Sequence, residues 1–286
     1  MVKLIKLITL VILLCLGISS GVENNIETII TTMDAHEQEI DSINLKYSWQ
    51  SGKYKNGERD FVKGVFAQKL SDGYLLLDEK FQRGKVWDDN QPVEGILRAY
   101  NGLSTRYFEH NTNKNGHHTG DIHKDHKPIF YKSIKNPYYR VWHLNYKTRF
   151  TDLLKDPNAM TSVHGEEVID GIKTTKIAFK SFNGSYDCYL WLLPEMNYLP
   201  IKFQSFAVAD GRTIMEMRWK EYKKFASNIW YPMEIIQFVR NTDNPNIMKV
   251  EMVEFSPLTK KDFEFTFPPS THVTDHIRGT SYLIED

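Results

Sequence analysis

Six Asn-Gly or Asp-Gly dipeptides separate short apolar runs along this chain, and they constrain its fold more than any other feature. They are Asn56-Gly57, Asp72-Gly73, Asn101-Gly102, Asp170-Gly171, Asn183-Gly184 and Asp210-Gly211. Both dipeptides tolerate the positive φ angles of a tight hairpin, so each is typical of a turn between antiparallel strands. No helix-length segments alternate with these runs, which argues against parallel βαβ units. The chain is therefore predicted to be mainly β, an antiparallel meander.

The runs between the turns alternate apolar and polar residues, which is the two-residue period of a half-buried strand. Residues 43–50 show it most clearly, with one parity occupied by Ile43, Leu45, Tyr47 and Trp49. Further strands are predicted at residues 58–70, 73–82, 96–100, 104–110, 173–182, 186–193, 199–208, 213–223, 229–240 and 247–255. All 16 Phe, 15 Tyr and 6 Trp lie after residue 46, and aromatic residues favour strands.

One convincing helix precedes the first strand. Its apolar residues recur at spacings of three, four and seven, and they are Ile26, Ile29, Ile30, Met33 and Ile40. Asn24 or Asn25 is a suitable N-cap. A second short helix is predicted at residues 150–155, followed by Asp156-Pro157.

The first 21 residues have the pattern of a secretory signal peptide. Lys3 and Lys6 precede an apolar stretch at residues 7–16, and small residues follow at 17–21. The apolar stretch is shorter than the roughly 20 residues that a membrane-spanning helix needs. We therefore expect export with cleavage of residues 1–21, and an uncleaved anchor is the alternative. Residues 22–286 are predicted to form a single domain.

Charge and cysteine content restrict the partners and the covalent chemistry. The 36 Lys and Arg residues balance 36 Asp and Glu residues, so no nucleic-acid partner is expected. Cys188 is the only cysteine after the leader, which excludes an internal disulfide in the exported chain. It shares its parity with Tyr186, Leu190 and Leu192, so we interpret it as a small buried residue.

Residues 111–127 are polar and rich in histidine, glycine and lysine, and they are predicted to form a long loop or insertion. The histidines in and beside it are His110, His117, His118, His123 and His126, with Asp121 and Asp125 among them. Imidazoles in such a cluster could hold zinc or respond to mild acid. Their spacing matches no compact zinc signature, so a solvated loop is the simpler interpretation. No metal and no cofactor is predicted.

The sequence argues against catalysis. Its one Gly-x-Ser-x-Gly match lies at residues 17–21, inside the predicted leader, where it cannot serve as a nucleophile elbow. Zinc-protease, Walker and dinucleotide-binding motifs are missing from the sequence. We therefore predict that the protein is not an enzyme.

Residues 229–239 are apolar on both parities of a strand. Ile229, Tyr231, Met233, Ile235 and Val239 lie on one parity, and Trp230, Pro232, Ile236 and Phe238 on the other. In a sheet with one face exposed to solvent, apolar and polar residues would alternate strictly along each strand. Something is therefore expected to cover each face of this strand. A filled core and a cavity beneath a helical lid both satisfy this requirement.

Three segments resemble the LolA-like outer-membrane lipoprotein-sorting superfamily of Gram-negative bacteria. They are residues 187–203, which contain Leu193-Pro194 and Leu199-Pro200, residues 219–232, which end in Tyr231-Pro232, and residues 263–275. The resemblance implies a strongly curved antiparallel sheet, an unclosed or half β-barrel. Its concave face would be covered by an N-terminal helix and a few short helices, and it would bind acyl chains.

The expected function that follows is a periplasmic carrier or sensor for lipid or lipoprotein acyl chains. Candidate cavity residues are Leu45, Tyr47, Trp49, Leu190, Leu192, Phe203, Met215, Met217, Trp219, Met233 and Ile235. The candidate lid residues are Ile26, Ile29, Ile30 and Met33. We expect a monomer that meets a membrane-associated donor or acceptor protein. The alternative is a periplasmic interaction or structural module with a filled core.

Overall fold

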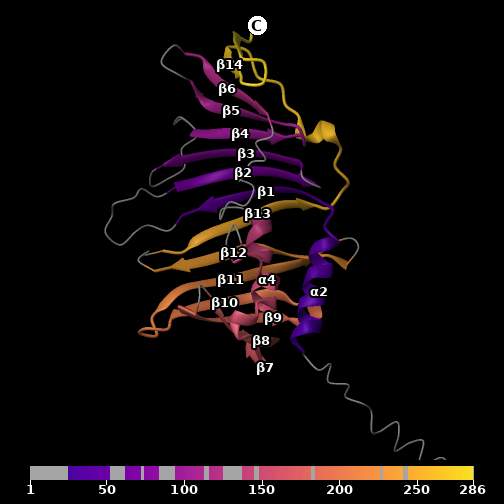
Figure 1. Cartoon of the computed structure of the whole chain (residues 1–286), viewed down its shortest axis with the longest axis vertical. Helices are drawn as coiled ribbons and strands as arrows, with labels where there is room; N and C mark the ends of the chain where they lie inside the picture. Colours follow the sequence, from indigo (N-terminus) through magenta and orange to yellow (C-terminus); the bar gives the residue numbers. More distant parts are fainter. Residues whose placement is uncertain are drawn as a thin grey trace, which may run out of the picture.

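The described residues of the computed structural model form one large curved, unclosed sheet of 15 strands with three α-helices (Figure 1). The structure describes residues 25–51, 62–71, 74–83, 94–112, 116–124, 137–144, 148–181, 184–225, 228–240 and 244–285. The predicted leader at 1–21 and the turns at 56–57 and 72–73 lie outside these ranges. The predicted fold class is confirmed.

The strands follow one another along the chain with short connections in most places. In the first half they are β1 (Ser42–Gln50), β2 (Val62–Ser71), β3 (Tyr74–Arg83), β4 (Glu94–Tyr100), β5 (Ser104–Thr112) and β6 (His118–Lys124). In the second half they are β7 (Ser162–Ile169), β8 (Ile172–Ser181), β9 (Tyr186–Leu193), β10 (Leu199–Ala207), β11 (Thr213–Lys224), β12 (Trp230–Val239) and β13 (Asn246–Glu254). Two short strands end the chain, β14 (Thr271–Asp275) and β15 (Thr280–Leu283).

The sheet consists of two antiparallel meanders that lie side by side. One runs from β1 to β6 and the other from β7 to β13, and they join where β1 pairs with β13, with Tyr47 opposite Val250. At the far end of the first meander β14 pairs with β6 in parallel, so the predicted all-antiparallel arrangement has one exception. The two edges of the sheet are β15 and β7.

All eleven predicted strands are present, and β9 has the predicted bounds. Asp170 and Gly171, which join β7 to β8, both have positive φ (50° and 81°), as the Asp-Gly turn requires. Strands β6, β7, β14 and β15 were not predicted. The loop prediction for residues 111–127 is wrong for residues 111–112, which end β5, and for residues 118–124, which form β6 between β5 and β14. Residues 113–115 and 125–127, with Asp125 and His126, lie outside the described residues.

The helices are α2 (Ile26–Gln38), α3 (Pro137–Trp142) and α4 (Phe150–Lys155). The Asn25 side chain caps α2 by accepting hydrogen bonds from the backbone N–H groups of Glu27 (2.7 Å) and Thr28 (3.1 Å). Both predicted helices are therefore confirmed, and α3 is additional. No described helix is long and apolar enough to cross a membrane. Short 3-10 helices occur at Pro157–Ala159, Pro194–Met196 and Lys260–Phe263.

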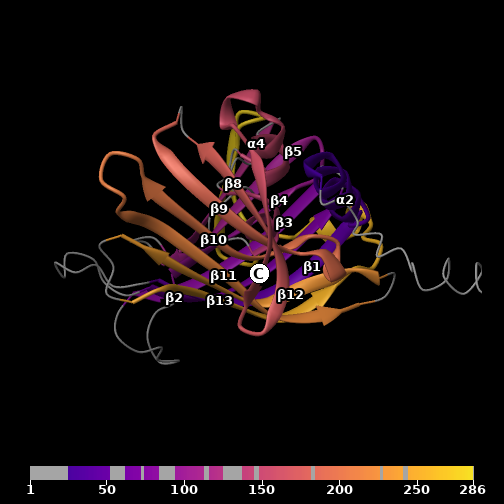
Figure 2. The same cartoon turned by 90° about the horizontal axis from the view of Figure 1, so that it is seen from below.

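The main hydrophobic core lies between the helices and one face of the sheet. Figure 2 shows the sheet curling round, with α2 and α4 across its open side. We call the sheet surface that meets the helices the inner face; it comprises the core-facing side chains of β1 and β8–β13. A smaller cluster of Trp191, Leu193 and Ile201 lies on the opposite, outer face, which explains why β9 is apolar on both parities.

Two further expectations concern single strands. Cys188 is buried in the main core, and burial raises the pKa of its thiol to about 11, which confirms that it is a structural residue. The expected cover on both faces of β12 is present in part. Tyr231, Met233 and Ile235 are buried on one parity. On the other parity Pro232 is buried, Trp230 and Ile236 are half-buried, and Phe238 is exposed.

Candidate functional site

The structure brings the predicted cavity residues together on the inner face. Ten of them are buried in the single main core, and Met215 packs at its margin. The ten come from β1, β9, β10, β11 and β12, and they are Leu45, Tyr47, Trp49, Leu190, Leu192, Phe203, Met217, Trp219, Met233 and Ile235. They form a continuous apolar surface because each strand directs alternate side chains to the same side.

Helix α2 covers part of this surface with the residues that the lid prediction named. Ile29, Ile30 and Met33 are buried in the main core, and Ile26 packs against it half-buried. The side chains of the sheet and the helix are in contact, so in this conformation the inner face is packed. A ligand on this face would have to displace α2 or another part of its cover.

Two further short helices cover the inner face, as the resemblance implied; α4 was predicted from the sequence as a helix, whereas α3 was not. Helix α3 contributes Tyr138, Val141 and Trp142, and α4 contributes Phe150 and Leu154. The Phe150 ring lies 6.1 Å from Trp219 and 5.9 Å from Phe203, so α4 sits over the middle of the second meander. The apolar residues of 137–142 were the available signal, but six residues are too few to show a helical period.

Ionic contacts hold α2 against α4. Arg149, which precedes α4, hydrogen-bonds to Asp34 (2.9 Å) and to Glu37, and Lys155 hydrogen-bonds to Asp34 (2.6 Å). Burial alone would raise the pKa of Asp34, but the hydrogen bond from Lys155 and the charges of Arg149 and Lys155 lower it below its ordinary value. Asp34 therefore stays ionised at neutral pH. We call Asp34, Glu37, Arg149 and Lys155 the ionic latch.

Several polar groups are enclosed with the apolar ones. Arg140 is buried, and burial lowers its pKa to about 10. Its guanidinium donates to the Leu144 carbonyl (3.2 Å) and to Gln237 Oε1 (3.5 Å), and its own carbonyl accepts from Trp219 Nε1 (2.9 Å). These contacts fix α3 to β11 and β12 and make this part of the cover specific in position.

His36 on α2 is also buried. Its ring lies edge-on to Trp142, with centroids 5.3 Å apart, and neither ring nitrogen has a hydrogen-bond partner among the described residues. Burial lowers the pKa of His36 to about 4, so its imidazole is neutral at pH 7. The attachment of α2 therefore depends on a histidine that must stay uncharged.

A pocket lies elsewhere, beside the edge strand β7. It has a volume of about 540 Å³, and its lining includes Val168, Ile172, Met196, Ile201 and Lys202. Val168 and Ile172 are 68% and 45% exposed. No sequence pattern indicated this pocket, because it forms between the β7–β8 hairpin and the β10–β11 hairpin, which β9 separates along the chain.

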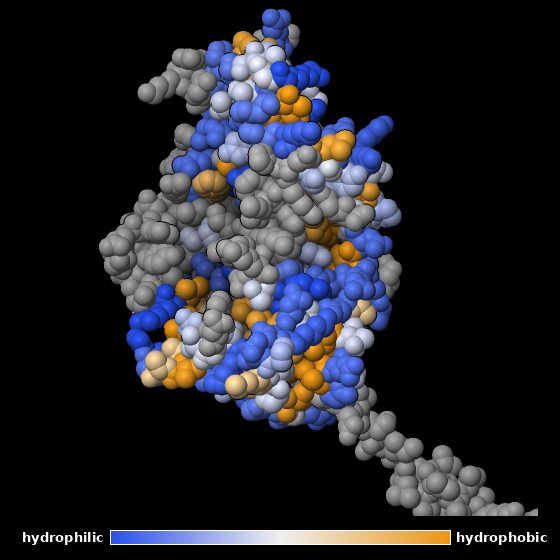
Figure 3. All heavy atoms as spheres, in the orientation of Figure 1, coloured by the Kyte–Doolittle hydropathy of each residue, from blue (hydrophilic) through white to orange (hydrophobic). Residues whose placement is uncertain are grey.

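The solvent-exposed surface of the helices carries both apolar and polar residues. Figure 3 shows several small apolar patches between polar residues in the lower half of this view, where α2 and α4 lie in Figure 1. The ionic latch lies partly exposed at this surface.

No family model and no curated protein sequence matches the chain. Its structure is similar to an outer-membrane lipoprotein-sorting protein domain from Vibrio parahaemolyticus, with a TM-score of 0.48 and 12% identity over 84% of this chain and 97% of that one. A DUF1329 family protein from Desulfovibrio piger gives a TM-score of 0.48 and 11% identity over the same shares. A LolA superfamily protein from Nitrosomonas europaea gives 0.44 and 12%, again over 84% and 97%. The solved structures similar to this chain therefore include lipoprotein-sorting, LolA superfamily and DUF1329 proteins, all at low sequence identity.

Proposed function

We propose that this protein binds the acyl chains of lipids or lipoproteins on its inner face, as a carrier or sensor without catalysis. One observation supports it above the others: the apolar surface of seven strands is covered by helices, not by a second sheet. Short helices can move as units, whereas a second sheet would be tied by its own ladder of hydrogen bonds. The proposal includes a periplasmic location after cleavage of residues 1–21, and a monomer.

The energetics of an acyl chain suit this surface. Each methylene that leaves water contributes about 0.8 kcal/mol, so ten methylenes contribute roughly 8 kcal/mol before ordering costs. The opposing free-energy cost is the exposure of Ile29, Ile30 and Met33 to water when α2 moves away. The ionic latch is partly exposed, and such pairs contribute about 0–1 kcal/mol each. An acyl chain that takes the place of α2 restores apolar contact, so exchange is favourable for a long chain.

In the proposed cycle the described conformation, with α2 packed on the inner face, is the closed one. A membrane-associated donor would deliver the acyl chain and an acceptor would remove it. Met215 and Met217, neighbours on one face of β11, would suit chains of different shape because thioether side chains are flexible.

Cross-linking α2 to α4 tests this mechanism. We would replace Asp34 and Lys155, whose side chains touch, by cysteine and join them with a short bis-maleimide. Cys188 will not compete because it is buried and its pKa is about 11. The parent and the uncross-linked variant should take up a fluorescent fatty acid, and the cross-linked form should lose at least nine-tenths of this uptake.

The matched control is a cross-link that leaves the cover free. Glu166 and Lys173 form an exposed ion pair (2.7 Å) on the hairpin of β7 and β8, and their cysteine pair joined in the same way should keep full uptake. Mass spectrometry of an organic extract of the purified protein should also detect lipid. Absence of both extracted lipid and fatty-acid uptake in the parent protein would overturn the proposal.

The pocket beside β7 favours a second candidate, the interaction module. Exposed Val168 and Ile172 lie at a sheet edge, where a partner could add a strand or fill the pocket. The fatty-acid experiment separates the two candidates, because an interaction module with a filled core would take up none.

A further inference from the structure

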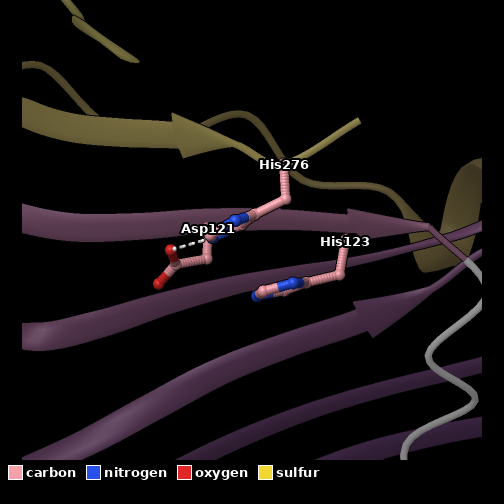
Figure 4. A group of neighbouring side chains, drawn as sticks. All are labelled: Asp121, His123 and His276. Carbon is pink, nitrogen blue, oxygen red and sulfur yellow. Dashed lines mark hydrogen bonds and ion pairs between the residues drawn. The ribbon is translucent and has the colours of Figure 1, made fainter. Parts of the chain in front are cut away.

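Asp121, His123 and His276 converge at the end of the sheet farthest from β7. Asp121 and His123 belong to β6, and His276 follows β14. One potential ligand atom from each side chain lies within 4.8 Å of the other two. Figure 4 shows the three side chains on the same side of the β6–β14 pair.

The backbone explains why these residues meet. Asp121 and His123 are two positions apart on one strand, so their side chains share a face. On β14 the buried residues are Thr271, Val273 and Asp275, which places the next residue, His276, on the opposite parity. The His276 N–H donates to the Ile122 carbonyl (2.9 Å), between the other two members of the cluster.

The turn after β14 is also held in place. The Asp275 carboxylate accepts hydrogen bonds from the backbone N–H groups of Ile277 (2.9 Å) and Arg278 (3.0 Å). This arrangement fixes the chain on both sides of His276. The backbone positions of all three side chains are thus set by the sheet and its turn.

The side chains already interact. His276 Nε2 lies 3.1 Å from Asp121 Oδ1, and the rings of His123 and His276 stack with centroids 4.2 Å apart and planes 12° apart. The His276 side chain is 47% exposed and that of Asp121 is 32% exposed, so the site is open to solvent. A bound ion could therefore reach the cluster directly and keep water as further ligands.

We propose that Asp121, His123 and His276 bind a divalent transition-metal ion, with Zn²⁺ as the representative case. Two imidazoles and one carboxylate suit zinc and its neighbours in the first transition row. Ca²⁺ and Mg²⁺ prefer oxygen ligands throughout, so this donor set excludes them as the main occupants. Three protein ligands with water in the fourth position give a tetrahedral site of moderate affinity.

The site would connect distant parts of the chain. Asp121 and His276 are 155 positions apart, so an ion bound to both would tie the last strands of the protein to the first meander. Binding to the folded state alone raises its stability in proportion to the logarithm of the metal concentration. This inference does not depend on the acyl-chain proposal, because the cluster is remote from the inner face.

Titration calorimetry of the full chain, without an added histidine tag, tests the proposal. We expect one Zn²⁺ per chain and no measurable heat with Ca²⁺ or Mg²⁺. His123→Ala and His276→Ala should each weaken Zn²⁺ binding at least tenfold, and Asp121→Asn should weaken it less. Zn²⁺ should also raise the Tm of the parent protein and leave that of His276→Ala unchanged.

His272 provides the matched control. It lies on β14 at the same parity as His276 and is exposed, but it is outside the cluster. His272→Ala should keep both the affinity and the Tm shift. Equal Zn²⁺ affinity in the parent and in His276→Ala, or no heat in the parent, would overturn the proposal. Circular dichroism, together with His276→Gln, separates loss of a ligand from loss of the fold.

Discussion

The two ends of the sheet bury different amounts of apolar surface and carry different chemistry. At the β7–β13 end, three helices close over the inner face and complete the main core. At the β6–β14 end, the described core is a small cluster of Phe108, Phe267 and Val273, and the segment before β14 provides the cover through Phe267. Apolar ligand chemistry is therefore proposed at one end and metal chemistry at the other. Substitutions at the two ends test whether they differ in stability as well.

The largest effect is expected from Trp219→Ala at the helix-covered end. Trp219 is fully buried, packs against Phe150 and donates its indole N–H to Arg140. Loss of a buried Trp leaves a cavity, so the free energy of unfolding should fall by about 3–5 kcal/mol. Urea unfolding followed by circular dichroism measures it. Trp219→Phe, which keeps most of the volume, should cost less; a loss below about 1 kcal/mol for Trp219→Ala would contradict the packing described.

Acid should weaken the same end through His36. Its pKa is about 4 in the folded protein and about 6.5 when unfolded, so the unfolded state binds more protons between these values. The stabilisation is complete above pH 6.5 and is lost as the pH falls toward 4, by about 3 kcal/mol. His36→Leu should remove this component from the pH dependence of unfolding. His164→Leu, at an exposed histidine, should retain it, and an unchanged curve for His36→Leu would exclude the assignment.

A smaller effect is expected at the β6–β14 end from Gly120→Ala. A methyl group at Gly120 would lie 2.5 Å from the Phe267 ring, which is itself buried. The ring must shift within its small cluster, so unfolding should become easier by about 1–3 kcal/mol. Thermal unfolding measures the change. Gly171→Ala is not a suitable control, because Gly171 has a positive φ and alanine would be strained there whatever its packing. Gly120→Ala combined with Phe267→Leu should recover part of the loss.

Much of the fold could be predicted from local patterns, and the exceptions have physical causes. The alternation in β1 and β9 and the helix at 150–155 depend on residues that are close in sequence, and the structure confirms them. Strand β6 has few apolar residues and is defined by its partners β5 and β14, so no period revealed it. Strand β7 is an edge strand whose residues are all exposed or half-buried, which gives a weak pattern.

The two candidate sites also differ in how far they could be predicted from local sequence patterns. The parity of apolar residues was enough to select a set that the structure places together on the inner face. It could not show that three helices pack against this set, because packing depends on the whole chain. For the metal cluster, sequence pointed to His123 and Asp121 in a histidine-rich segment, but His276 comes beside them only through the parallel β6–β14 pairing.

The junction of β1 with β13 also determines the order in which the sheet can be assembled. Ser42 at the start of β1 donates its hydroxyl hydrogen bond to the Ser256 carbonyl, 214 positions later, so the centre of the sheet closes only when most of the chain is present. Until then β1 has one open edge, which could pair with a foreign strand. Loop closure over such a separation slows folding relative to local hairpins. We therefore expect the two meanders to form early and their union at the middle of the sheet to be a late step of folding.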